Sequence, residues 1–257
     1  MGGGTNSALR GLLDEAEMSN TGLARAVVHA GAREGIHLGT DTTAVKRMLD
    51  GAQVTHLRQL DCRYGSGRTR VRVVQLLNHE ANELLHGSYS EKIGRALLPA
   101  VAKAAWLAGF TAGDVGRHSL GQRYYIQALN LAMAGGDRLY AGYLLSQMSR
   151  MTQGIARGIV TEFDRVRHAR QSVVLARAGL ALTQGVATPL LVTQLHVAEG
   201  RGLALLGEVT ATRRAMREAE QHHERVHPGA EPPWLSLYTD ASLAADLGRC
   251  LRDIGEP

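Results

Sequence analysis

The sequence has little of what a secreted or membrane-spanning protein needs. Its two cysteines, Cys62 and Cys250, are too few for a disulfide framework, so we expect a reducing, cytoplasmic location. Aromatic residues make up only 4% of the chain, so the core must depend mainly on Leu, Val and Ala. No apolar run reaches about 18 residues, and the N-terminus carries acids without an apolar stretch. We therefore expect neither a membrane span nor a secretory signal.

Motifs of catalysis and metal binding are also missing. There is no Gly-x-Ser-x-Gly motif, no P-loop and no glycine loop after a strand, and no segment alternates like a strand. His79 and His86 are seven residues apart, whereas two zinc ligands on one helix face need a spacing of four. His222, His223 and His227 offer a better spacing but no convincing third ligand, which favours a solvated helix face. We expect no enzyme, no cofactor and no metal site.

Residues 92–134 predict two amphipathic helices joined by a tight turn at Gly113–Gly116. When Gly109 is counted as position 8 of a unit of about 34 residues, small or aromatic residues fall where a tetratricopeptide repeat needs them. These residues are Gly109, Gly116, Gly121, Tyr125 and Ala128. Small side chains at these positions let two helices approach closely. The pattern therefore predicts an antiparallel helical hairpin.

A second copy of the pattern occurs near the C-terminus. Its members are Gly200, Gly207, Thr212, Met216 and Ala219. Further amphipathic stretches lie between the two copies. We therefore expect an all-α fold in which residues 91–257 form an array of helical hairpins like that of tetratricopeptide repeats.

Before the array, helices are predicted at residues 6–17, near 20–30 and at 42–49. This outline is that of a helix-turn-helix, in which a short helix lies in the major groove of DNA. Its DNA-binding residues would be Thr42, Thr43, Lys46 and Arg47. A sequence pI near 9.5 permits a nucleic-acid partner without requiring one. The alternative is a three-helix subdomain whose basic residues are simply solvated.

Several segments carry a resemblance to one class of proteins. They are SNTGLARAVVHAGAREGIHLGTDTTAVKRMLDG, QLDCRYGSGRTRVRVVQLLN, GQRYYIQALNLAMAGGDRLYAGYLLSQMSR and PPWLSLYTDASLAADLGRCLRDIG. The chain resembles actinobacterial regulators that join an XRE-type helix-turn-helix to C-terminal tetratricopeptide repeats. The resemblance implies sequence-specific binding of double-stranded DNA at one end and sensing of an effector or partner at the other.

The chain departs from that pattern in two places. Met48 stands where such regulators usually carry a tryptophan, and the helices expected after Gln53 look shortened. Val45, Met48 and Leu49 should therefore lack core partners. The family's array usually continues beyond Pro257, so an apolar end face should be exposed here, which favours a homodimer.

The expected organisation has three parts: a helix-turn-helix-like segment at 1–51, a basic linker with a connecting helix at 52–90, and the hairpin array at 91–257. The linker's arginines either lie on phosphates or are solvated. They are Arg58, Arg63, Arg68, Arg70 and Arg72.

The first helices of the hairpins should line a groove that holds a peptide, protein or small effector. Outward positions on these helices are Lys103, Trp106, Gln147, Arg150, Gln194 and Glu199. The sequence thus predicts a transcriptional regulator that binds DNA and senses a ligand in this groove. The alternative is an interaction or scaffold protein that has lost DNA binding. Exposure of the Thr42–Arg47 face would favour the regulator.

Overall fold

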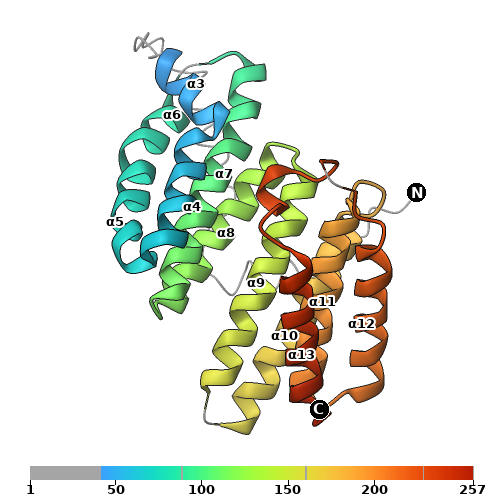
Figure 1. Ribbon diagram of the computed structural model, residues 1–257. Helices are drawn as coiled ribbons and strands as arrows, with labels where there is room; N and C mark the ends of the chain where they lie inside the picture. Colours follow the sequence, from blue (N-terminus) through green and yellow to red (C-terminus); the bar gives the residue numbers. More distant parts are fainter. Residues whose placement is uncertain (1–41, 88, 160, 228, 257) are drawn as a thin grey trace, which may run out of the picture. The chain divides into compact units, whose positions relative to one another are not determined.

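The computed structural model describes residues 42–87, 89–159, 161–227 and 229–256. Within these ranges the chain is entirely helical, without a strand, and successive helices pack as antiparallel pairs (Figure 1). The prediction of an all-α fold built from hairpins is therefore confirmed. The helices predicted at 6–17 and 20–30 lie outside the described residues.

The described chain divides into two compact units at Ala141 and Gly142, within one helix. The first unit contains α3 (Thr42–Asp50), α4 (Ala52–Tyr64), α5 (Ser66–Leu76), the π-helical turn η1 (Leu77–Ala81), α6 (Asn82–His86), α7 (Glu91–Asp114) and α8 (His118–Ala134). Helix α9 (Arg138–Gly158) continues into the second unit. That unit also contains α10 (Glu162–Leu182), α11 (Pro189–Leu205), α12 (Val209–His223), the 3-10 turn η2 (Pro233–Leu235) and α13 (Asp240–Asp253).

Helix α7 is the central helix of the first unit, and α3, α4, α5 and α8 all pack against it. Its N-terminus is capped by Ser90, whose hydroxyl accepts a hydrogen bond from the Ile93 N–H at 3.5 Å. By length and composition α7 could cross a membrane, with a mean hydropathy of 1.3 over 18 residues. However, 72% of that window is buried inside the fold, as in the core helix of a globular unit.

The crossing of α7 and α8 depends on a close backbone approach at Gly109. A Cβ added to Gly109 would lie 2.5 Å from Cδ1 of Tyr125 and 3.0 Å from the carbonyl oxygen of Gly121. Gly116, with a φ of +78°, makes the turn between the two helices. The predicted role of Gly109 and Gly121 in this hairpin is therefore confirmed.

The segment expected to be a basic linker is helical from Ala52 to Leu76, interrupted only at Gly65. Gly65 has a φ of +80° and joins α4 to α5 as a tight hairpin. Helix α3 packs against α4 and α7, which leaves Val45 8% and Met48 2% exposed. The expectation of missing core partners is therefore wrong for Val45 and Met48, which α4 and α7 cover, whereas Leu49 is 40% exposed.

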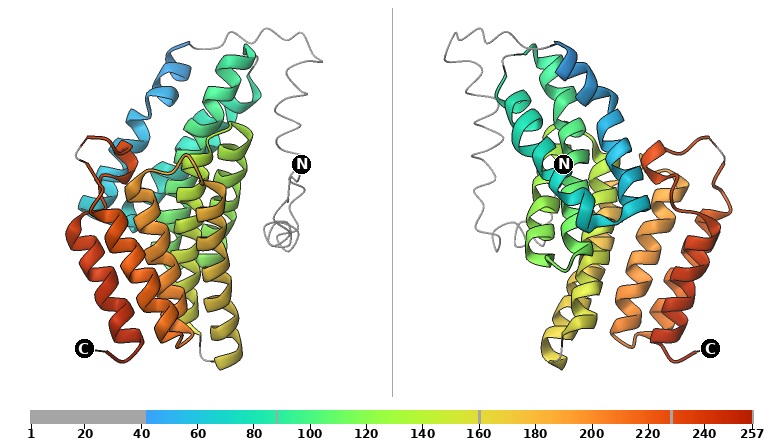
Figure 2. Two further views of the ribbon diagram at one scale, coloured as in Figure 1. Left: turned by 90° about the vertical axis from the view of Figure 1, so that its right-hand side faces the viewer. Right: turned by 60° about the vertical axis from the view of Figure 1, so that its left-hand side comes forward.

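In the second unit, α11 packs against α10, α12 and α13 (Figures 1 and 2). Buried hydrogen bonds tie α9 to two of these helices: Ser149 donates to the carbonyl of Ser172 on α10 at 2.8 Å, and Gln153 donates to that of Ala198 on α11 at 2.6 Å. The second pattern copy is looser than the first, since a Cβ on Gly200 would meet Ala215 at an ordinary 3.4 Å.

The last helix, α13, begins with a capping box formed by Thr239 and Ser242. None of the large apolar side chains that are exposed in the described chain belongs to α13. The exposed apolar end face expected for this helix is therefore absent. The homodimer stays a prediction, without that support.

Candidate nucleic-acid interface

The short helix α3 separates an apolar face from a basic one. Val45 and Met48 point into the unit, whereas Thr43, Lys46 and Arg47 are exposed. Arg47 lies 3.8 Å from the carboxylate of Glu80, and both side chains remain substantially exposed, at 51% and 37%. An ion pair this open is weak, so the Arg47 guanidinium is available to another anion.

Residues 42–76, which form α3, α4 and α5, carry the basic charge of the chain. They contain seven Lys or Arg residues and two Asp residues, an excess of five that equals the formal net charge of the whole sequence. The rest of the chain is therefore neutral as a whole. An anionic partner would be drawn to this region by long-range attraction.

One of the seven cations has a structural role. The Arg58 guanidinium pairs with Asp61 and lies 4.2 Å from the ring centroid of Phe110 on α7. Asp61 in turn accepts a hydrogen bond from Ser66 at 2.6 Å, at the start of α5. Arg58 thus holds the α4–α5 hairpin on α7, and we exclude it from the candidate interface.

Three further arginines, Arg63, Arg68 and Arg72, are exposed. Arg68 and Arg72 line a hollow of about 230 Å³ together with Leu60, Tyr64 and Thr69. The ring of Tyr64 is 50% exposed and lies 5.4 Å from the Arg63 guanidinium. An exposed aromatic ring among arginines is a common surface for phosphates and nucleobases.

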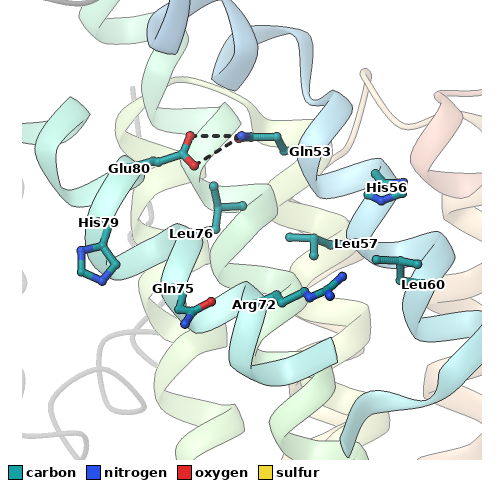
Figure 3. A pocket seen from close by; sticks show the side chains of 9 residues that line it. All are labelled: Gln53, His56, Leu57, Leu60, Arg72, Gln75, Leu76, His79 and Glu80. Atoms are coloured by element: carbon teal, nitrogen blue, oxygen red, sulfur yellow. Dashed lines mark hydrogen bonds between the residues drawn. The ribbon is translucent and has the colours of Figure 1, made fainter. Parts of the chain in front are cut away.

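A larger hollow of about 470 Å³ lies between α4 on one side and α5 and η1 on the other (Figure 3). Leu57, Leu60 and Leu76 supply apolar lining, and Arg72 lines both hollows. At one end Gln53 donates to both oxygens of Glu80, at 3.1 and 3.4 Å. The π-helical turn η1 contributes His79 and Glu80; such turns often occur at functional sites.

The six residues predicted to line a partner groove do not share one environment. Trp106 and Gln194 are buried, at 7% and 3% exposure, so the prediction that they face outward is wrong. Trp106 packs against Phe110 on its own helix, with ring centroids 5.9 Å apart. Lys103 is half-buried, with its ammonium 5.9 Å from the centre of the Tyr140 ring.

The other three predicted groove residues, all half-buried, have polar partners in the second unit. Gln147 donates to the Ser146 hydroxyl at 3.3 Å, and Glu199 accepts from the Arg177 Nε at 2.7 Å. Arg150 reaches Oδ2 of Asp246 on α13 at 2.8 Å.

The buried Asp246 carboxylate gathers several cationic partners. Arg201 and Arg249 bind its Oδ1, at 3.1 and 2.8 Å, whereas Arg150 binds its Oδ2. Burial raises the pKa of Asp246, but Arg150 and Arg201 outweigh it and hold that pKa below its usual value. Burial and the neighbouring Arg150 lower the pKa of Arg201 to about 10. This cluster joins α9, α11 and α13 and was not predicted, because Arg150 and Asp246 are 96 residues apart in the sequence.

The fold also assembles a group of metal-ligand type that the sequence analysis missed. His196 of α11 lies beside Glu218 and His222 of α12, with one potential ligand atom from each within 4.8 Å of the others. The expectation that no third ligand lies near His222 is therefore wrong. The Glu218–His222 spacing of four was the available signal, but the partner on α11 depends on helix pairing.

The two cysteines differ in exposure. Cys250 is buried, which raises the pKa of its thiol to about 12. Cys62 is exposed on α4, and neither cysteine forms a disulfide in the described structure. Burial therefore makes the Cys250 thiol a poor nucleophile.

Residues 9–58 match the family model described as the SP15 N-terminal domain. The described part of the match runs through α3 and into α4, and includes Lys46 and Arg47. No curated protein matches the chain, and no solved structure matches it either. The resemblance to XRE-type regulators with tetratricopeptide repeats is therefore wrong: the N-terminal match is to a different family, and no model of the expected families matches.

Proposed function

We propose that the protein is a DNA-binding regulator whose basic α3–α5 surface contacts the phosphates of double-stranded DNA. The observation that carries the proposal is the arrangement on α3, where Val45 and Met48 anchor the helix while Lys46 and Arg47 stay exposed. The proposal is also supported by the charge distribution, because the whole excess of basic over acidic residues lies within residues 42–76.

Helix α3 would be the element that enters the major groove. Its nine residues span about 13 Å at 1.5 Å per residue, and a major groove about 12 Å wide admits one helix. Lys46 and Arg47 would contact phosphates or guanine edges, and Thr43 would contact phosphates or a thymine methyl group. The side chain of Thr42, the other threonine predicted to bind DNA, lies outside the described part of the structure. The exposed Arg63, Arg68 and Arg72 would extend the phosphate contacts along α4 and α5.

The second unit, read as a tetratricopeptide-like array, would bind the effector or partner. Arg150 and Arg249 both pair with Asp246, yet 30% and 46% of their side-chain surfaces remain exposed. A carboxylate of an incoming peptide or small molecule would find two guanidinium groups fixed in place. A cytoplasmic location and a homodimer belong to the same proposal.

The test is the salt dependence of binding to random-sequence duplex DNA, measured by fluorescence anisotropy. We expect affinity to fall steeply with salt, and the double variant Lys46→Ala, Arg47→Ala to reduce the slope of log K against log salt by about 2. The matched control, Arg214→Ala with Arg217→Ala, removes two exposed charges from α12. That control should leave the slope almost unchanged.

Absence of binding at low salt would defeat the proposal. So would equal slopes for the α3 variant and the α12 control, because that result would mean that binding depends on total charge alone. Circular dichroism on each variant would establish that the helices are intact.

The alternative function, an interaction or scaffold protein without DNA binding, has one observation in its favour. The hollow in Figure 3 has apolar lining from Leu57, Leu60 and Leu76, which suits a side chain of a protein partner better than a phosphate. If the anisotropy experiment fails, the substitution Leu60→Glu would test this reading by its effect on partner capture.

A further inference from the structure

The most developed group of ligand-type side chains outside the basic surface lies between α11 and α12. His196, Glu218 and His222 are half-buried, and the potential ligand atoms lie within 4.8 Å of one another. The two imidazole rings are nearly parallel, at 21°, with centroids 5.8 Å apart. Glu218 makes no ion pair with any residue that the structure describes, so its carboxylate is available to an ion.

We propose that His196, Glu218 and His222 form a binding site for a divalent transition-metal ion, with Zn²⁺ as the best match. Two imidazoles and one carboxylate are a ligand set that zinc accepts, with a fourth position left for water. Glu218 and His222 are four residues apart on α12, so one helix face presents both. The ion would join this face to α11.

A second observation on His196 supports the site. Its Nδ1 atom is buried without a hydrogen-bond partner and lies 3.5 Å from Oε2 of Glu199. An ion bound to Nε2 of His196 would leave the ring proton on Nδ1, and this N–H could then donate a hydrogen bond to Glu199. A carboxylate behind the imidazole is the usual way in which proteins orient a metal-binding histidine.

The charges around the site also suit a cation. Glu199 is itself held by Arg177, whose Nε lies 2.7 Å from its other oxygen, so its position is fixed. Glu218 adds a carboxylate to the two imidazoles, and this carboxylate attracts a cation. The three potential ligand atoms lie within 4.8 Å of one another. Zinc holds its nitrogen and oxygen ligands at about 2.0–2.2 Å, so the three side chains need to move only a little closer together to bind one ion.

The experiment uses the full chain without a histidine tag, stripped with a chelator and titrated with Zn²⁺ in a calorimeter. We expect one zinc per chain and a rise in the unfolding temperature. His196→Ala and His222→Ala should each abolish both effects. Glu199→Gln should weaken zinc binding by about 10- to 100-fold, as loss of a group that orients a ligand does.

The matched control is His227→Ala, which removes an exposed histidine just beyond α12. It should bind zinc as the unmodified chain does. Titration with Co²⁺, followed by its visible absorption, gives a readout that does not depend on stability, and should report a four-coordinate ion that His222→Ala loses. The proposal is overturned if the unmodified chain binds no zinc, or if His196→Ala and His222→Ala bind it as tightly as His227→Ala.

Discussion

The two units use arginine in opposite ways. In the first unit, Arg63, Arg68 and Arg72 are exposed on α4 and α5, whereas the half-buried Arg58 pairs with the buried Asp61. In the second, three arginines from three helices converge on one carboxylate, Asp246, that is 1% exposed. The same residue type therefore serves as free charge in one unit and as a structural tie in the other.

This difference shows that charge alone does not locate a binding surface. Arg150 is paired with Asp246, so only the 30% of its side chain that stays exposed can meet a ligand. Lys46 and Arg47 carry no comparable tie, apart from the long contact between Arg47 and Glu80. What distinguishes the two regions is the buried acidic partner, Asp246, which Arg150 has and which Lys46 and Arg47 lack.

The largest effect is expected from Asp246→Asn, which leaves Arg150, Arg201 and Arg249 without their carboxylate. Removing one member of a buried ion cluster typically costs about 3–5 kcal/mol. We expect about 3 kcal/mol here, since Arg150 and Arg249 partly reach solvent. Urea unfolding would measure it through Trp234, whose ring lies 4.9 Å from that of Tyr143 in the same unit.

The pH dependence of the same cluster gives a second readout. The pKa of Asp246 is held below its usual value in the folded chain, so its contribution is present above about pH 4 and lost as pH falls further. The unmodified chain should therefore lose stability on acidification more steeply than Asp246→Asn. Asp253→Asn, at a more exposed ion pair, should cost about 1 kcal/mol or less. Equal costs for both variants would contradict the structural role of Asp246.

The next contrast concerns helix packing rather than charge. In Gly109→Ala the new methyl group would overlap the Tyr125 ring, and we expect a loss of about 1–3 kcal/mol from overpacking. In Gly200→Ala the new methyl group would meet Ala215 at 3.4 Å, which is an ordinary contact. Alanine also favours a helix more than glycine does, so the stability should stay unchanged or rise by up to about 1 kcal/mol. Thermal unfolding of the two variants compares the crossings directly. A loss at Gly200 as large as that at Gly109 would contradict the comparison.

How much the sequence could predict differs between these features. The α7–α8 hairpin was predictable because its small residues and Tyr125 are close in sequence, where periodicity determines which faces meet. The helices over 52–76 were missed as a packed hairpin because arginines and glycine suggested a linker. Burial of Val73, at 0% exposure, depends on α7, which periodicity within that segment alone does not identify.

The candidate sites show the same limit. The exposure of Lys46 and Arg47 follows from the apolar positions Val45 and Met48, which are local to α3. In contrast, the proximity of His196 to His222 requires knowing that α11 and α12 pair in one register. Composition and spacing predicted the basic helix, whereas tertiary pairing alone assembles the histidine site.

The smallest effect, and the most direct check on the free charges of the first unit, is expected from Glu80→Gln. Glu80 lies 3.8 Å from Arg47 and competes with any DNA phosphate for that guanidinium. Neutralising it should raise affinity for duplex DNA by up to about fivefold at low salt, because exposed ion pairs are worth up to about 1 kcal/mol. The gain should fade as salt screens the surface. Anisotropy titrations at two salt concentrations would measure both. Glu83→Gln, the same charge change at an exposed position on α6, should give a smaller gain. If the two variants were indistinguishable, Arg47 would be no more than one charge among many, and α3 would lose its special place in the interface.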